Sequence, residues 1–147
     1  VGAPTQEARA ALLAPPAADR DEYMEQSLAA EVWASKRYWD PDAQRALAAA
    51  TYDRCFYPEG ASRQLAAIYA SGDRSAALAE SAVPMLVIHG RDDTLITPDG
   101  GERTASLVPG ARLLLLSDMG HDTPRPLWPV FAEAIGGHAR SVAAMDT

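Results

Sequence analysis

One carboxylate and one imidazole stand just beyond the two most apolar segments of the 147-residue chain. Asp93 follows the apolar run 85–89 in "MLVIHGRDD", and His121 follows the run 113–116 in "LLLLSDMGHD". A carboxylate that accepts the Nδ1–H of an imidazole fixes its tautomer and stabilises the imidazolium that forms during proton transfer. If the fold brings these two side chains together, they form an acid–base pair that can activate a nucleophile.

The segments that carry the two residues predict a strand–helix–strand unit. Both apolar runs lack alternation, which suits parallel strands covered on both faces. The intervening "TPDGGERTASLVPGA" favours a helix that begins at its Thr-Pro pair and ends at Pro109-Gly110. The crossover of such a unit is right-handed, and functional groups gather at the carboxyl ends of its strands. With adjacent strands ~5 Å apart, we expect an Asp93 oxygen within roughly 3.5 Å of an imidazole nitrogen of His121.

The first part of the chain predicts helices and no strand. In "DRDEYMEQSLAAEVWASKRYW", apolar residues recur every four positions, which indicates one helix with an apolar face. Asp19 is placed to cap its start, and Asp40-Pro41 is expected to end it and begin the next helix.

Two further helices complete this part of the chain. The helix over "DAQRALAAATYDRCFYPEG" is expected to stop at Pro58 and Gly60, and the one over "SRQLAAIYASG" at Gly72. A last helix is expected near the C-terminus, in "PLWPVFAEAIGG". The predicted fold class is therefore α/β, with a helical segment over 1–81 and two parallel strands with flanking helices over 82–147.

Composition limits the partners of the chain. Its net charge is −7, with 48% hydrophobic and 22% charged residues, which describes a globular protein. Clustered Lys and Arg are absent, so we expect binding neither to nucleic acid nor to an anionic membrane surface. No apolar run approaches the ~20 residues of a membrane span, and "VGAPTQEARA" has no signal-peptide pattern. A single cysteine, Cys55, excludes an internal disulfide and thiolate zinc sites of the usual kind. Together these features predict a soluble, cytoplasmic domain.

The two strand-and-turn segments also carry a family resemblance. "VPMLVIHGRDDTLITP" followed by "GARLLLLSDMGHD" resembles the C-terminal portion of the α/β-hydrolase fold family. The resemblance implies that Asp93, third after Gly90, is the catalytic acid, and that His121, directly after Gly120, is the catalytic base. It also implies that residues 1–81 are the family's helical cap, inserted after the sixth strand. The remainder, 82–147, would be the C-terminal part of the core domain.

A longer set of sequence words is similar to bacterial esterases of the aclacinomycin methylesterase type. These words are "GDRSAAL", "PDGGERTA", "PGARL", "MGHD" and "LWP". The chain departs from that pattern at Asp118, where those esterases usually have glycine. The resemblance implies hydrolysis of a small carboxylic ester, without a metal or a cofactor.

The nucleophile of such a hydrolase is missing from the chain. The G-x-S-x-G elbow is absent, and so is the oxyanion loop that precedes it. None of the serines follows an apolar strand between small residues. Because the family order is nucleophile, acid, histidine, the serine should lie upstream of residue 93. The sequence therefore predicts a C-terminal fragment of a serine hydrolase, inactive by itself; the alternative is a non-catalytic fragment or interaction module.

Each of the polar residues near the site also has a simpler interpretation. Asp93 could serve only as a turn or helix-capping residue, as Asp often does. Asp92 is better explained as solvated or turn-forming, although it could replace its neighbour as the acid. His121 could merely cap a loop. His89, at a strand end, is interpreted as a structural histidine and His138 as a tail residue without chemistry, and the histidine spacings match no metal motif.

Two structural expectations concern packing. Cys55 is interpreted as a buried, structural residue late in a helix. Five aromatic residues could roof an apolar substrate site, although packing between cap helices is the favoured interpretation: Trp33, Tyr38, Trp39, Tyr57 and Tyr69.

The strand 85–89 also has a free edge. In the family it has a neighbour on each side, but this chain supplies only 112–116. We therefore expect either a homodimer through the open sheet edge or a loosely packed, poorly soluble species.

Overall fold

The strand–helix–strand unit is present in the computed structural model, which describes residues 1–144. Strand β1 (Leu86–Gly90) and strand β2 (Arg112–Leu116) run parallel, with Val87 opposite Leu113. Helix α6 (Pro98–Leu107) connects them and begins with proline, whose fixed φ suits the first turn of a helix. The predicted α/β class and the two parallel strands are confirmed.

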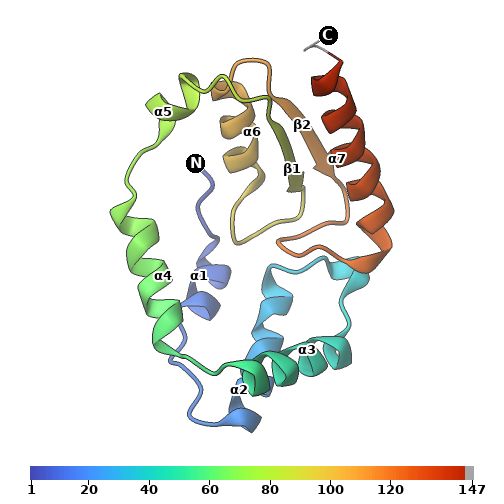
Figure 1. The fold of residues 1–147 in the computed structure, drawn as a ribbon. Coiled ribbons are helices and arrows are strands. Elements are labelled where there is room, and N and C mark those ends of the chain that lie inside the picture. Colours follow the sequence, from blue (N-terminus) through green and yellow to red (C-terminus); the bar gives the residue numbers. More distant parts are fainter. Residues whose placement is uncertain (145–147) are drawn as a thin grey trace.

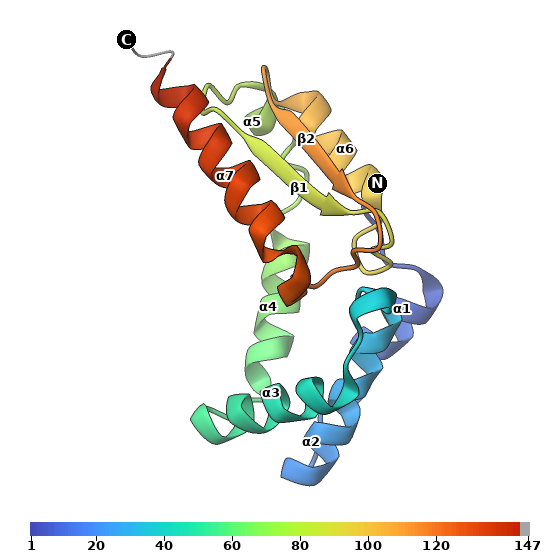
Figure 2. The same ribbon diagram turned by 90° about the vertical axis from the view of Figure 1, so that its right-hand side faces the viewer.

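Helices flank the small sheet on both sides. Helix α6 packs on one face, and α7 (Trp128–Ala143) runs along the other side, after the short 3₁₀ turn η3 (Arg125–Leu127) (Figures 1 and 2). The helix α7 continues through the glycine pair at which the sequence suggested an end. Each glycine costs a helix only about 1 kcal/mol, which weakens but does not break it. His138 therefore lies inside α7 and not in a tail.

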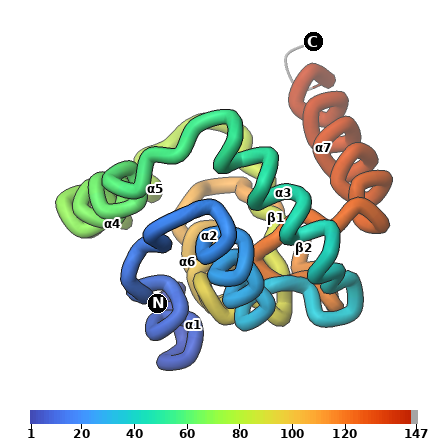
Figure 3. The backbone as a smooth tube through the Cα atoms, turned by 90° about the horizontal axis from the view of Figure 1, so that it is seen from below, coloured from blue at the N-terminus to red at the C-terminus, as the bar shows by residue number. Residues whose placement is uncertain are grey.

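The first part of the chain is helical throughout, as predicted, and forms no strand between residues 1 and 81. Viewed from below, α1, α2 and α3 lie beneath the sheet, and α4 lies apart from them to one side (Figure 3). The elements are α1 (Gln6–Leu12), α2 (Arg20–Ser27), η1 (Leu28–Val32), η2 (Lys36–Tyr38), α3 (Pro41–Arg54), α4 (Glu59–Ala70) and α5 (Ser75–Ala79).

The prediction of one helix across residues 20–39 is wrong. Both of its proposed boundaries hold, since the side chain of Asp19 caps α2 and that of Asp40 caps α3. Between them, however, α2 gives way to the 3₁₀ turns η1 and η2. After η1, a contact distant in sequence stops the helical path: the N–H of Ser35 bonds the carboxylate of Asp122 instead of continuing a helix ladder.

The prediction for the end of the second helix is also wrong. Helix α3 ends at Arg54, and Pro58 is the N-cap of α4 with Gly60 inside that helix. Proline is as compatible with a helix start as with a helix end, and here it marks the start. The third helix ends as expected, with Gly72 at a φ of 61° just beyond its C-cap. Cys55 is the C-cap of α3 and is exposed, so the expectation that it is buried is wrong.

A different aromatic group packs the first helices together. Tyr52 and Phe56 stack with ring centroids 4.3 Å apart, and Tyr23 of α2 meets both rings. Tyr57 and Tyr69, for which we expected helix packing, are exposed. The contact between α2 and α3 therefore rests on an aromatic cluster that the sequence did not single out.

Candidate active site

The two residues singled out by the sequence meet at the carboxyl end of the sheet. The Nδ1 of His121 lies 2.7 Å from the Oδ2 of Asp93. Asp93 comes three residues after the end of β1, and His121 five residues after the end of β2. Because the strands are parallel and adjacent, the turns that follow them lie side by side. The predicted contact within 3.5 Å is confirmed.

The carboxylate of Asp93 has two tasks, one for each oxygen. Its Oδ1 accepts the backbone N–H groups of Leu95 and Ile96, both at 2.9 Å, which shapes the turn. Its Oδ2 is the atom that contacts His121. The side chain is only 4% exposed, and a buried carboxylate is tolerated where donors satisfy its oxygens. The turn-forming interpretation and the histidine-pairing interpretation of Asp93 therefore describe the same residue.

Two glycines allow the turns to pack backbone against backbone. A Cβ on Gly90 would lie 2.3 Å from the carbonyl oxygens of Met119 and Gly120. A Cβ on Gly120 would lie 2.2 Å from the carbonyl oxygen of Trp33. Such distances are far inside van der Waals contact, so only glycine fits at either position. The N–H of Asp92 adds a 2.9 Å bond to the carbonyl of Met119, which ties the two turns directly to each other.

The departure at Asp118 has a local explanation. This residue has a φ of 60°, in the left-handed region that glycine adopts most readily. Aspartate is among the few other residues that occur there repeatedly. Its carboxylate also accepts a 2.8 Å bond from the guanidinium of Arg37, and this hydrogen bond raises the pKa of Arg37 above its usual value. The histidine turn thus keeps its glycine-like backbone and gains a contact with the first part of the chain.

The imidazole of His121 keeps one edge open. Its side chain is 42% exposed, and no residue between 1 and 144 hydrogen-bonds its Nε2. Because Nδ1–H donates to the carboxylate, Nε2 carries the lone pair of the neutral ring. An imidazole held in this way can take a proton from a hydroxyl placed against Nε2 and can later return it.

The neighbouring polar residues take other positions. Asp92 is exposed, and the carboxylate that contacts His121 belongs to Asp93. The Nε2 of His89 bonds the carbonyl of Ile96 at 2.8 Å and stands 3.5 Å from the Oδ2 of Asp93. A nitrogen that bonds a carbonyl oxygen must carry a proton, so His89 braces this turn, which fits the structural interpretation.

The first part of the chain reaches both turns, which the sequence did not reveal. The hydroxyl of Thr94 donates to the carbonyl of Val32 at 2.8 Å, and the N–H of His121 donates to that of Trp33 at 2.7 Å. Ser35, which is completely buried, bonds Gly120 and Asp122. No spacing rule joins residues this far apart in sequence, and an isolated serine beside a helix carries no signal of its own.

The described part of the chain shows no other cluster with obvious chemistry. Between residues 1 and 144 no group of three or more His, Cys, Asp or Glu residues is placed to hold a metal ion. Within the same range, no helix has the length and apolar character needed to cross a membrane.

Solved structures of hydrolases share the fold of this chain. The esterase RhEst1 from Rhodococcus sp. ECU1013 matches with a TM-score of 0.65 and 18% identity, over 94% of this chain and 49% of its own. Est816, described as an N-acyl homoserine lactone degrading enzyme, matches with a TM-score of 0.55 and 23% identity, over 90% of this chain and 51% of its own. A hydrolase from Pseudomonas aeruginosa PA01 matches with a TM-score of 0.57 and 26% identity, over 95% of this chain and 51% of its own. No protein-family model matches the chain.

The chain has the fold of the C-terminal portion of an α/β-hydrolase. It spans about half the length of the solved structures that it matches. The fold and the hydrolase resemblance predicted from the sequence agree with these comparisons.

Proposed function

We propose that this chain supplies the acid and the base of a serine hydrolase that cleaves small carboxylic esters. The observation that carries the proposal is the 2.7 Å contact between a buried carboxylate and a partly exposed imidazole, Asp93 and His121. The esterase and hydrolase structures that share the fold support the same class of reaction. The narrower resemblance to esterases of the aclacinomycin methylesterase type rests on sequence words alone and belongs to this proposal.

The proposed mechanism divides the work between the two residues. The Nε2 of His121 removes the proton of a serine hydroxyl as that oxygen attacks the ester carbonyl, and then gives the proton to the leaving alcohol. Asp93 holds the ring in the Nδ1–H tautomer and stabilises the imidazolium between these steps. In the second half-reaction His121 activates a water molecule in the same way, which releases the acid.

We assign the nucleophile to a segment that precedes residue 1. Ser35 contacts the histidine turn, but its hydroxyl is fully buried and bonded to Asp122. In this proposal residues 1–81 act as the cap over a small-molecule ester, and the protein works in the cytoplasm without a metal or a cofactor.

A fluorophosphonate probe tests the proposal, because it reacts with activated serines. The 147-residue chain should remain unlabelled, and a protein extended by the upstream coding sequence should be labelled at one serine. In the extended protein, His121→Ala should lower ester turnover by several orders of magnitude, as removal of a triad member does in other hydrolases. Asp93→Asn should lower it strongly as well.

Two matched variants control for unspecific damage. Asp92→Asn and His138→Ala change the same residue types outside the Asp93–His121 contact and should leave turnover within about twofold. Strong labelling of the 147-residue chain would place the nucleophile within it. If the extended protein is not labelled either, the non-catalytic alternative is favoured.

A further inference from the structure

The loop that carries His121 is held from the opposite half of the chain. Segment 33–35, which lies between the 3₁₀ turns η1 and η2, contacts three consecutive residues of this loop. We propose that Ser35 is a positioning residue for the imidazole of His121. The inference deepens the proposed function, on which it rests, by naming a residue that acts through the base.

A single hydroxyl holds both sides of the histidine. The Oγ of Ser35 accepts the N–H of Gly120, one residue before His121, at 2.9 Å. The same hydroxyl donates to the Oδ1 of Asp122, one residue after His121, at 2.5 Å. The backbone N–H of Ser35 donates to that carboxylate oxygen as well, at 2.8 Å.

The backbone of the same segment completes the contact. The carbonyl of Trp33 accepts the N–H of His121 at 2.7 Å. It also lies so close to Gly120 that a Cβ there would come within 2.2 Å of its oxygen. These contacts therefore hold residues 120–122 independently of the contact between the imidazole and Asp93. Only the side-chain torsions of His121 depend on that second contact.

Burial makes the hydroxyl hard to replace. Ser35 is 0% exposed, so water cannot reach Gly120 in its place without a rearrangement. With alanine at position 35, the buried N–H of Gly120 has no acceptor and Asp122 keeps one of its two donors. A loop released in this way lets the imidazole leave the geometry required for proton transfer, and displacements of about 1 Å can cost 10²-fold in rate.

The first experiment needs no catalytic activity. The imidazole ¹⁵N chemical shifts of the 147-residue chain report which ring nitrogen of each histidine is protonated. In the wild type at neutral pH, His121 should be in the Nδ1–H tautomer, because Nδ1 donates to Asp93. In Ser35→Ala the His121 shifts should move toward the Nε2–H form favoured by a free imidazole. His89, whose Nε2–H donates to the carbonyl of Ile96, should keep its Nε2–H tautomer and serves as an internal control.

Three further variants separate positioning from general stability. Ser71→Ala removes a hydroxyl that bonds only the carbonyl of Ala67 in its own helix and should leave His121 unchanged. Ser35→Thr retains the hydroxyl and should restore the Nδ1–H tautomer. Asp122→Ala breaks one side of the contact and should give a smaller shift than Ser35→Ala, and it also serves as the test if Ser35→Ala does not fold.

The second experiment uses the extended, active protein. Ser35→Ala should lower kcat by about 10- to 100-fold with KM within about twofold, because substrate binding is untouched while the base is misplaced. A lowered melting temperature with unchanged His121 shifts would overturn the positioning role and leave Ser35 merely structural. Because the shifts are measured without turnover, an inactive extended protein would count against the proposed function alone.

Discussion

The two halves of the chain are organised in opposite ways. In residues 82–144, two paired strands are each followed by a turn that contains a glycine, and these turns place Asp93 and His121 next to each other at the end of the sheet. In residues 1–81, helices form a loose arch, and large apolar side chains such as Ile68 and Tyr69 of α4 remain 66% and 70% exposed (Figure 1). The segment from Val32 to Arg37 departs from this pattern, because it bonds both the Asp93 turn and the His121 turn.

The difference shows how chemistry and rigidity are divided. The second half carries Asp93 and His121, and its local geometry already brings them together. The first half carries neither, but its buried Ser35 and the carbonyl of Trp33 hold the histidine loop. Damage to the contact between the halves should therefore affect the site more than damage to the exposed helices.

The largest loss of folding stability is expected from a substitution at Gly120, where the two halves of the chain touch without room for a side chain. Gly120→Ala would put a Cβ 2.2 Å from the carbonyl oxygen of Trp33 and 2.5 Å from the carbonyl carbon of Ala34. Because both neighbours are backbone atoms, they cannot simply rotate away. We expect unfolding by denaturant to show a loss of about 3 kcal/mol, with the His121 Nδ1–H tautomer lost as well.

Gly110→Ala is the matched control for this substitution. Gly110 has a φ of 74° and nothing within 4 Å of a built Cβ, so alanine meets backbone strain alone. We expect a cost of about 1 kcal/mol and an unchanged tautomer. If the two alanine variants lose equal stability, the close packing of the halves does not determine the site.

The sequence predicted the second half well because its signals are local. A continuous apolar run indicates a buried strand, and Gly90 and Gly120 occur where a side chain would collide with the neighbouring turn. In a parallel strand–helix–strand unit, the turns after two adjacent strands lie side by side at the same edge of the sheet. The pairing of Asp93 with His121 follows from that topology.

The parts that the sequence missed depend on contacts between distant residues. Between η1 and η2 the chain leaves the helical path where Ser35 bonds Asp122, 87 positions away. The predictions for Pro58 and Cys55 are wrong because a proline can begin or end a helix, and because a cysteine's burial depends on what packs against it. Neither property is contained in the local sequence.

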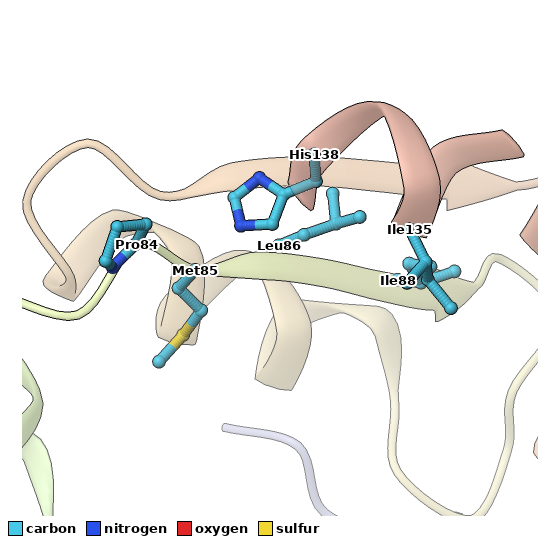
Figure 4. Close-up of a pocket in the computed structure, with 6 residues that line it drawn as sticks. All are labelled: Pro84, Met85, Leu86, Ile88, Ile135 and His138. Carbon is cyan, nitrogen blue, oxygen red and sulfur yellow. The ribbon is translucent and has the colours of Figure 1, made fainter. Parts of the chain in front are cut away.

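The open edge of β1 should show the next largest effect. The carbonyl of Met85 and the N–H of Arg91 both bond β2, so by strand alternation the amides of Leu86 and Ile88 face away from it. Beside this edge lies an open depression in which Ile135 and His138 of α7 face β1 (Figure 4). The Nδ1 of His138 is buried there without a partner among residues 1–144. The depression is lined by Pro84, Met85, Leu86, Ile88, Ile135 and His138.

We expect a second copy of the chain to pair along this edge at high protein concentration, since unpaired strand edges template such contacts. Sedimentation should then show a dimer, and hydrogen exchange at Leu86 and Ile88 should slow as concentration rises. Val87 and His89 face β2 and should be protected at every concentration. A monomer in which all of these amides exchange slowly would mean that the first half covers the edge.

The smallest effect is expected in the exposed helices of the first half, at the ion pair between α2 and α3. Arg20 binds both carboxylate oxygens of Asp53, at 2.8 and 2.9 Å. The hydrogen bonds from Arg20 lower the pKa of Asp53 below its usual value. A carboxyl group with a lowered pKa in the folded state stabilises the fold above its unfolded pKa, and this contribution disappears as pH falls through the lowered, folded value.

Asp53→Asn should therefore lower the melting temperature at neutral pH by only about 1 °C, since both side chains are largely solvated. The difference from the wild type should shrink as the pH falls into the acid range, because the wild-type carboxylate becomes protonated and loses its attraction for Arg20. A double-mutant cycle with Arg20→Gln isolates the pair, and added salt should weaken the coupling. The His121 tautomer should not change in any of these variants, because the side-chain bonds of Arg20 go to Asp53 and Met24 and not to segment 32–37. If it does change, the contact between α2 and α3 is transmitted to the site, and the first half is less loosely built than its exposed side chains indicate.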